Sequence, residues 1–94
     1  MKQLIWSPAF TRQLKRLVRQ NPQIKNLVAK KLQQLTDDPF HSSLHTHKLK
    51  GDLEGRWSCS IDYSQRIVFR FVENPDFKTE EILLLAIGSH DEVY

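Results

Sequence analysis

The fold follows from the segment RWSCSIDYSQRIVFRF at residues 56–71, in which apolar and polar side chains alternate. A period of two places successive side chains on opposite faces of a β-sheet. The segment therefore predicts two strands with one buried face. The residues expected on that face are Trp57, Cys59, Ile61, Ile67, Phe69 and Phe71. The same alternation places Ser60, Arg66 and Arg70 on the opposite face.

The N-terminal half has the spacing of two amphipathic helices. Ser7-Pro8 is a helix-start signal, an N-cap followed by proline at the first helical position, and Asn21-Pro22 repeats it. The second helix is expected to stop around Asp37-Asp38-Pro39. The inward positions recur at helical spacing and are Phe10, Leu14, Leu17 and Val18, then Ile24, Leu27, Val28, Leu32 and Leu35.

Two further strands complete the predicted domain. Residues 3–6 form a short first strand, and residues 81–87 form a last one, separated from the preceding strand by Asn74-Pro75-Asp76. The last strand is almost wholly apolar, so we expect it to be internal in the sheet. The order β-α-α-β-β-β predicts one α+β domain over residues 1–94. Its sheet would be mostly antiparallel, with both helices on one face and the other face left for function.

The charge of the chain is unevenly distributed. The net charge is +3 and the isoelectric point about 9.2. Between Lys2 and Lys50 there are ten Lys or Arg residues and two acids, whereas from Gly51 onward nine acids accompany four bases. The N-terminal half is therefore the part expected to face a polyanion such as nucleic acid. The alternative is that these residues are simply the solvated faces of helices.

Several classes of protein are excluded or disfavoured. The longest apolar run, near residues 82–87, is too short to cross a bilayer, and no charged-then-apolar leader opens the chain, so we expect a cytoplasmic protein without a membrane partner. Cys59 is the only cysteine, which excludes an internal disulfide. The histidines lack the paired spacing of a zinc site, so we predict no metal and no cofactor.

Histidine and cationic residues before the first hairpin suggest proton transfer next to a phosphate. His47 lies beside Lys48 and Lys50, and nearby cations favour the neutral, basic imidazole. His41 and His45 are assigned to a solvated loop. Arg66, on the open sheet face, would form a phosphate-binding surface with the two lysines. The alternative for Arg66 is a cross-strand ion pair with Asp62 or Glu54.

The C-terminus contributes a second proton-transfer group. Gly88-Ser89-His90 follows the apolar strand directly, and the glycine allows a sharp turn that places His90 at the rim of the sheet. Tyr94, the last residue, could stack on an unpaired base or take part in proton transfer. Alternatively it plugs the edge of the core, or frays with the tail.

Three segments in order resemble the RelE/ParE superfamily of toxins from type II toxin–antitoxin systems. They are LKGDLEGRWS at residues 49–58, RIVF at residues 66–69 and IGSHDEVY at residues 87–94. The first two are similar to the YoeB branch, and the third to the YafQ and RelE branches. The resemblance covers essentially the whole chain and implies a ribonuclease that enters the ribosomal A site, cuts mRNA and is held by an antitoxin protein.

The resemblance also implies roles for particular residues. His47 corresponds to the catalytic base, Arg66 to the arginine that stabilises the phosphate in the transition state, and His90 to the acid. Tyr94 corresponds to a terminal aromatic that stacks on or orients the RNA. The residues expected to contact RNA phosphates are Lys48, Lys50, Arg56 and Arg70.

Two positions depart from the pattern that this resemblance implies. Ser60 stands where YafQ-like toxins have a second histidine, and Ala86 where they have an arginine. Two alternatives therefore stay open: a ParE-like poison of DNA gyrase, and a non-catalytic module that binds RNA or antitoxin. The pairing of His47 with His90 favours the ribonuclease, because ParE-like chains generally lack an acid–base pair.

Overall fold

A computed structural model of the chain describes residues 2–94. Its helices and strands are β1 (Leu4–Trp6), α1 (Pro8–Gln20), α2 (Ile24–Asp37), β2 (His47–Lys48), β3 (Trp57–Ser60), β4 (Gln65–Asn74), β5 (Thr79–Ser89) and α3 (His90–Val93). Two short 3₁₀ turns, η1 (Ser42–Leu44) and η2 (Gly51–Leu53), flank β2. The predicted α+β class is confirmed. The sequence analysis missed β2, of two residues, and α3, of four.

The strands form one five-stranded sheet in the order β1-β5-β4-β3-β2. The first strand pairs with β5 in parallel, and the other three pairs are antiparallel. The prediction that the apolar last strand is internal is confirmed, because β5 has a neighbour on each side. A bulge between Val68 and Phe69 interrupts the long β4–β5 ladder.

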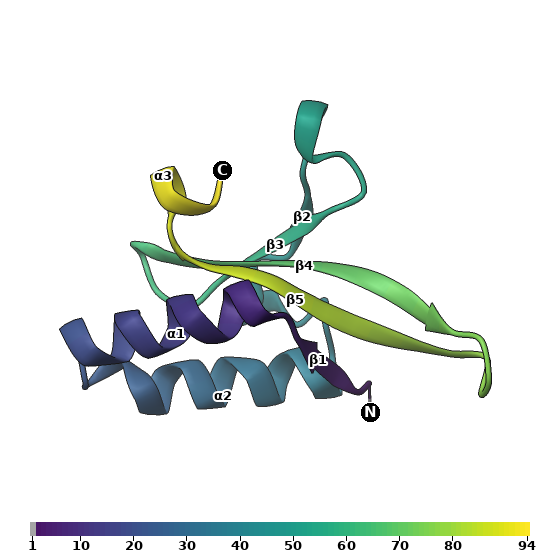
Figure 1. Cartoon of the computed structure of the whole chain (residues 1–94), viewed down its shortest axis with the longest axis horizontal. Coiled ribbons are helices and arrows are strands. Elements are labelled where there is room, and N and C mark those ends of the chain that lie inside the picture. Colours follow the sequence, from purple (N-terminus) through teal and green to yellow (C-terminus); the bar gives the residue numbers. More distant parts are fainter. Residues whose placement is uncertain (1) are drawn as a thin grey trace.

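Both long helices lie on one face of the sheet, as Figure 1 shows, and the core lies between them. The alternation read from residues 56–71 is confirmed: Cys59, Ile67 and Phe69 are completely buried in this core. Trp57 and Phe71 pack against its margin. The helices contribute the apolar positions predicted for them, including Phe10, Ile24, Val28, Leu32 and Leu35.

The helix boundaries follow the predicted signals with one exception. The Ser7 hydroxyl accepts a hydrogen bond from the backbone N–H of Phe10 at 3.1 Å, so Ser7 caps α1 as expected. The second start signal was wrong, because Asn21 ends α1 by donating its N–H to the carbonyl of Leu17 at 2.8 Å. The second helix begins at Ile24, without a side-chain cap, and ends at Asp37 as predicted.

The opposite face of the sheet is not fully open, which corrects the expectation from the sequence. Ser58 and Val68 point to that face and are buried, with 0% and 1% of their surface exposed. Figure 1 shows α3 folded back over this side of the molecule, where it contacts β4 and β5. Tyr94 donates a hydrogen bond from its hydroxyl to that of Ser58. The last turn of the chain therefore closes part of the functional face.

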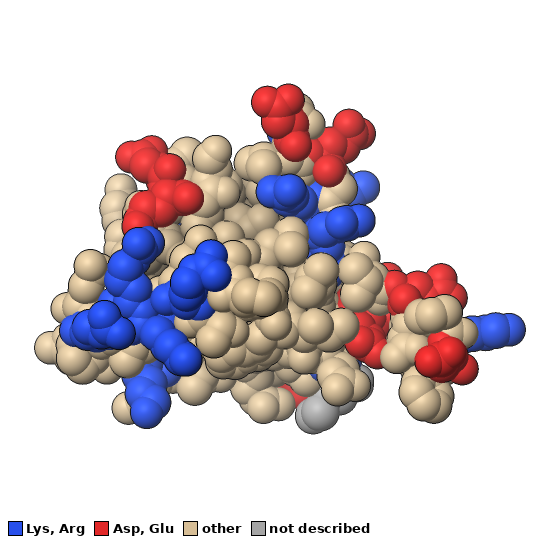
Figure 2. Space-filling model, viewed as in Figure 1, with Lys and Arg blue, Asp and Glu red and all other residues tan. Residues whose placement is uncertain are grey.

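The charges separate over the surface of the molecule. Figure 2 shows basic side chains gathered at the α1 end, and acidic ones on the β4–β5 hairpin that projects from the opposite end. The basic residues of α1 are Arg12, Lys15, Arg16 and Arg19. Within residues 2–94, no helix is long and apolar enough to span a membrane.

Candidate functional site

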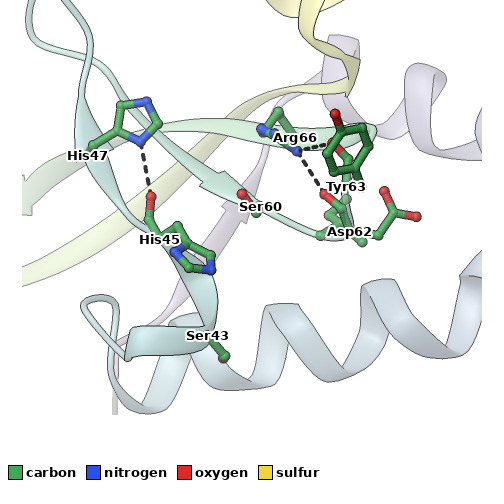
Figure 3. Close-up of a pocket in the computed structure, with 8 residues that line it drawn as sticks. Ser43, His45, His47, Ser60, Asp62, Tyr63 and Arg66 are labelled. Carbon is green, nitrogen blue, oxygen red and sulfur yellow. Dashed lines mark hydrogen bonds between the residues drawn. The ribbon is translucent and has the colours of Figure 1, made fainter.

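A pocket of about 480 Å³ opens on the functional face, between the segment before β2 and the β3–β4 turn. Figure 3 shows His45 and His47 on one side, Arg66, Tyr63 and Asp62 on the other, with Ser60 between. The full lining is Ser43, His45, His47, Ser60, Ile61, Asp62, Tyr63 and Arg66. The predicted base and the predicted phosphate-binding arginine therefore share one pocket.

The imidazole of His47 is oriented by a backbone hydrogen bond. Its Nδ1 lies 3.0 Å from the carbonyl oxygen of His45. A carbonyl oxygen can only accept, so Nδ1 carries the hydrogen, and in the neutral ring Nε2 then has the free lone pair. His45 adopts a left-handed backbone conformation, with φ of 49°. This conformation follows η1 and precedes the two-residue strand that carries His47. The arrangement gives His47 the tautomer of a general base.

The guanidinium of Arg66 is held by the turn that precedes it. Its Nη1 donates to the carbonyl oxygens of Asp62 at 2.8 Å, Tyr63 at 3.1 Å and Gln65 at 3.1 Å. Among the described residues Arg66 has no ion pair with Asp62 or Glu54, so that alternative is wrong. The Asp62 carboxylate instead accepts backbone N–H groups of the turn, including that of Gln65 at 2.8 Å. The positive charge of Arg66 thus faces the pocket without a neutralising carboxylate.

His90 and Tyr94 lie on α3, above the same face of the sheet. The His90 ring packs edge-on against the Tyr94 ring, with centroids 4.3 Å apart, and its Nδ1 lies 3.6 Å from a carboxylate oxygen of Asp91. Tyr94 is hydrogen-bonded to Ser58, which is the cross-strand partner of His47. His90 does not line the pocket, but a series of direct contacts links it to the strand that carries the pocket.

The position of α3 depends on Glu92 and Gly88. The Glu92 carboxylate accepts the backbone N–H of Ser89 at 2.9 Å and lies 3.4 Å from Nη2 of Arg16. The hydrogen bonds from Ser89, together with the charge of Arg16, lower the pKa of Glu92. A Cβ added to Gly88 would lie 3.2 Å from the Cβ of Glu92. Since Gly88 pairs with Arg66 across the sheet, the same strand end positions α3 and borders the site.

The basic residues predicted to bind phosphate do not form one surface with Arg66. Lys48 pairs with Trp57, and its Nζ lies 5.4 Å from the centroid of a Trp57 ring, on the face opposite to Arg66. Neighbouring residues in a strand point to opposite faces, so Lys48 and His47 cannot share one. Lys48, Lys50 and Arg56 line a second pocket of about 490 Å³. Arg70 is exposed and lies on the Arg66 face.

Three residues of the pocket were not assigned to a site from the sequence. His45 was assigned to a solvated loop, but its side chain lines the pocket beside His47. Asp62 was considered only as an ion-pair partner, and Tyr63 was not singled out. The turn-forming Asp62-Tyr63-Ser64 between two alternating segments was the available signal. It could have placed an aromatic residue at the tip of the hairpin.

Cysteine and metal chemistry have no support in the geometry. Burial raises the pKa of the Cys59 thiol to about 12, although the charges of Lys31 and Arg66 oppose the shift. The thiol is thus protonated and inaccessible at neutral pH. Across the described part of the chain, no group of three or more His, Cys, Asp or Glu side chains could hold a metal ion.

Solved structures with the same fold are bacterial toxins. A metal-bound toxin from Helicobacter pylori is 26% identical with a TM-score of 0.78, over all of both chains. A YoeB/ParE toxin from Agrobacterium tumefaciens is 19% identical with a TM-score of 0.76, over 94% of this chain and 98% of that one. YafQ in the Escherichia coli DinJ–YafQ toxin–antitoxin complex is 12% identical with a TM-score of 0.76, over 99% and 97%. The fold is therefore that of the YoeB and YafQ toxins.

The family model narrows this class. The model described as "Bacterial toxin of type II toxin-antitoxin system, YafQ" matches residues 2–94. The chain belongs to this family, and the resemblance to the RelE/ParE superfamily is confirmed. A comparison with curated proteins gives no match.

Proposed function

We propose that this YafQ-family toxin is an endoribonuclease that cuts mRNA in the ribosomal A site, using side chains alone. The observation that carries the proposal is the shared pocket of His47 and Arg66. The first has its Nε2 lone pair free and the second has an uncompensated charge. A base beside a fixed cation is the minimum equipment for transfer of an RNA phosphate to its own 2′-hydroxyl.

The first step forms a bond between the 2′-oxygen and the adjacent phosphorus. His47 takes the 2′-hydroxyl proton on Nε2 as this bond forms, which gives a pentacoordinate phosphorane. Arg66 stabilises the added negative charge. Because three backbone carbonyls already hold its Nη1, little side-chain reorganisation is needed when that charge develops.

The second step breaks the bond between phosphorus and the 5′-oxygen. His90 gives its proton to that oxygen, so the products are a 2′,3′-cyclic phosphate and a 5′-hydroxyl end. His90 is then reprotonated by solvent, and His47 releases the proton it took. Tyr94 acts as a positioning residue, since its ring packs against His90 while its hydroxyl is tied to Ser58. DNA, which lacks the 2′-hydroxyl, would be inert.

The remaining cations hold the RNA on either side of the reacting phosphate. Arg70 extends the Arg66 face along β4, whereas Lys48, Lys50 and Arg56 surround the second pocket and would contact phosphates further along the strand. The toxin from Helicobacter pylori has been seen with bound metal. The donor set of this chain does not fit a resident metal ion, and no proposed step passes through one.

A cognate antitoxin is the expected protein partner. YafQ of Escherichia coli forms a complex with the antitoxin DinJ. The basic residues at the α1 end of this chain would attract an acidic or amphipathic segment of such a protein. Arg16 lies within this region and also contacts Glu92 of α3. A bound antitoxin could therefore reach the element that carries His90.

The direct test is incubation of the purified protein with mRNA programmed on ribosomes, beside His90→Ala, with the ends of the fragments mapped. We expect cuts confined to the A-site codon, 5′-hydroxyl and cyclic phosphate ends, and a rate about 10²–10⁴-fold lower in the variant. Fragments with 5′-phosphate ends would contradict the proposed chemistry. Intact mRNA with folded protein would favour gyrase poisoning or a binding-only module, which a DNA supercoiling assay separates.

A further inference from the structure

Tyr63 is an exposed aromatic side chain at the rim of the pocket. It has 97% of its surface accessible, the largest value among the exposed large hydrophobic residues of the described chain. The others are Ile5, Trp6, Phe40, Phe77 and Tyr94, and none of them lines this pocket. Figure 3 places the Tyr63 ring beside Arg66, across the pocket from His47. A bare aromatic ring at this position has no structural role within the fold.

The backbone that carries this ring is fixed by hydrogen bonds. The Asp62 carboxylate accepts the N–H groups of Ser64 at 2.9 Å and Gln65 at 2.8 Å. The turn is closed by the N–H of Ile61, which donates to the carbonyl of Gln65 at 3.0 Å. The Tyr63 carbonyl itself accepts from Arg66 at 3.1 Å. The ring is thus presented from a rigid turn, and the same hydrogen bond sets its distance from the cation.

Tyr94, the residue that the resemblance assigned to stacking, is less available. Its ring packs against His90 and its hydroxyl is bonded to Ser58, so only 37% of its surface is exposed. A base that stacked on Tyr94 would have to share the ring with these contacts. Tyr63 has both faces of its ring free for a ligand.

We propose that Tyr63 is the platform on which a nucleobase next to the scissile phosphate stacks. The inference rests on the proposed ribonuclease function. Aromatic side chains bind unpaired bases through their faces, and each such contact contributes to affinity with little sequence preference. With the phosphate on Arg66 and the 2′-hydroxyl at His47, a base turned out of its stack lies against Tyr63. The ligand is therefore single-stranded RNA, held by a base, a phosphate and a ribose hydroxyl at once.

The test uses short 2′-O-methyl RNA oligonucleotides of mixed sequence that contain 2-aminopurine, whose fluorescence falls when the base stacks. The 2′-O-methyl group blocks the nucleophile, so binding is measured without cleavage. We compare the wild-type protein with Tyr63→Ala, Tyr63→Phe and the control Phe77→Ala. Phe77 is 76% exposed on the β4–β5 hairpin and does not line the pocket. Unfolding midpoints of all four proteins should agree, because neither ring is packed in the core.

We expect quenching by the wild-type protein, Tyr63→Phe and Phe77→Ala, and binding about 5- to 100-fold weaker by Tyr63→Ala without comparable quenching. Equal affinity and quenching of Tyr63→Ala and wild type would overturn the inference, as would the absence of binding by the wild type. The proposed function is tested separately, by cleavage of unmodified mRNA on ribosomes. Tyr63-dependent quenching without cleavage would support the stacking site and contradict only the ribonuclease activity.

Discussion

The two faces of the sheet are built from the same strands but have opposite properties. On the helix-covered face, Cys59, Ile67 and Phe69 are completely removed from water. On the other face, one residue away along the chain, Arg66 lies in an open pocket and only a four-residue helix provides cover. The difference teaches that stability and chemistry are separated here by the alternation of the strand, and not by distance.

This arrangement predicts that substitutions on the two faces have separable effects. Loss of apolar area on the helix side should appear in the free energy of unfolding, because a packed core cannot fully close a cavity. Loss of a polar group on the other side should appear in the rate, because those side chains are exposed and contribute little to packing. The α3 region connects the two faces and should show both effects, each smaller.

The largest effect on stability is expected for Phe69→Ala. The ring is fully buried between the sheet and the helices, so its removal should lower the free energy of unfolding by about 3–5 kcal/mol. Urea unfolding followed by circular dichroism measures this loss. A change below about 1 kcal/mol would mean that this face is not the main core. The exposed Phe77→Ala serves as the matched aromatic control.

His47→Ala should produce the converse result. We expect the rate of mRNA cleavage to fall about 10²–10⁴-fold, because the 2′-hydroxyl loses its proton acceptor. The unfolding midpoint should stay near that of the wild type, since the side chain is exposed. His41→Ala, an exposed histidine of the same segment outside the pocket, should retain activity. If the two variants cleave equally well, His47 is not the base.

Gly88→Ala should have an intermediate effect on activity. The new methyl group would lie 3.2 Å from Glu92 and displace α3, which carries His90. We expect roughly a tenfold loss of cleavage with a destabilisation of about 1 kcal/mol. The control is a double-mutant cycle with Glu92→Ala. If the contact with Glu92 causes the defect, adding Gly88→Ala to Glu92→Ala should cost little more. Strictly additive losses would argue for a different cause.

The smallest effect concerns the pH dependence of stability. Hydrogen bonds from Ser89 lower the pKa of Glu92 in the folded state. The stabilisation is therefore complete above the usual carboxyl pKa and is lost as the pH falls through the lower folded value. Glu92→Gln removes this titration, so its stability should fall less steeply than that of the wild type below about pH 4.5. Unfolding titrations between pH 3 and pH 6 measure the difference, and parallel profiles would exclude the linkage.

Much of the fold could be predicted because it depends on local patterns. The alternation in residues 56–71, the cap at Ser7 and the break after Asn74 act through near neighbours, and all three are present in the structure. The failures arose where a signal had two possible uses. Asn21 ends one helix instead of starting the next, because its N–H is taken by the carbonyl of Leu17.

The candidate site was predictable in its residue types but not in its arrangement. His47 and Arg66 were selected from the sequence, and they line one pocket. Lys48 was grouped with them, although its pairing with Trp57 places it on the other face. The exposed ring of Tyr63 and the placement of His45 depend on how two separate loops approach each other. No local pattern in either loop reports that approach.

The sequence by itself determined the helices, the long strands, the buried face and the kinds of group available for chemistry, because periodicity and charge are properties of neighbouring residues. Only the tertiary structure decided which of those groups meet. The antiparallel register brings His47 opposite Ser58, and the return of α3 ties Tyr94 to that same serine. These contacts join residues far apart in the chain. Their geometry is set by packing of the whole domain, which no single segment encodes.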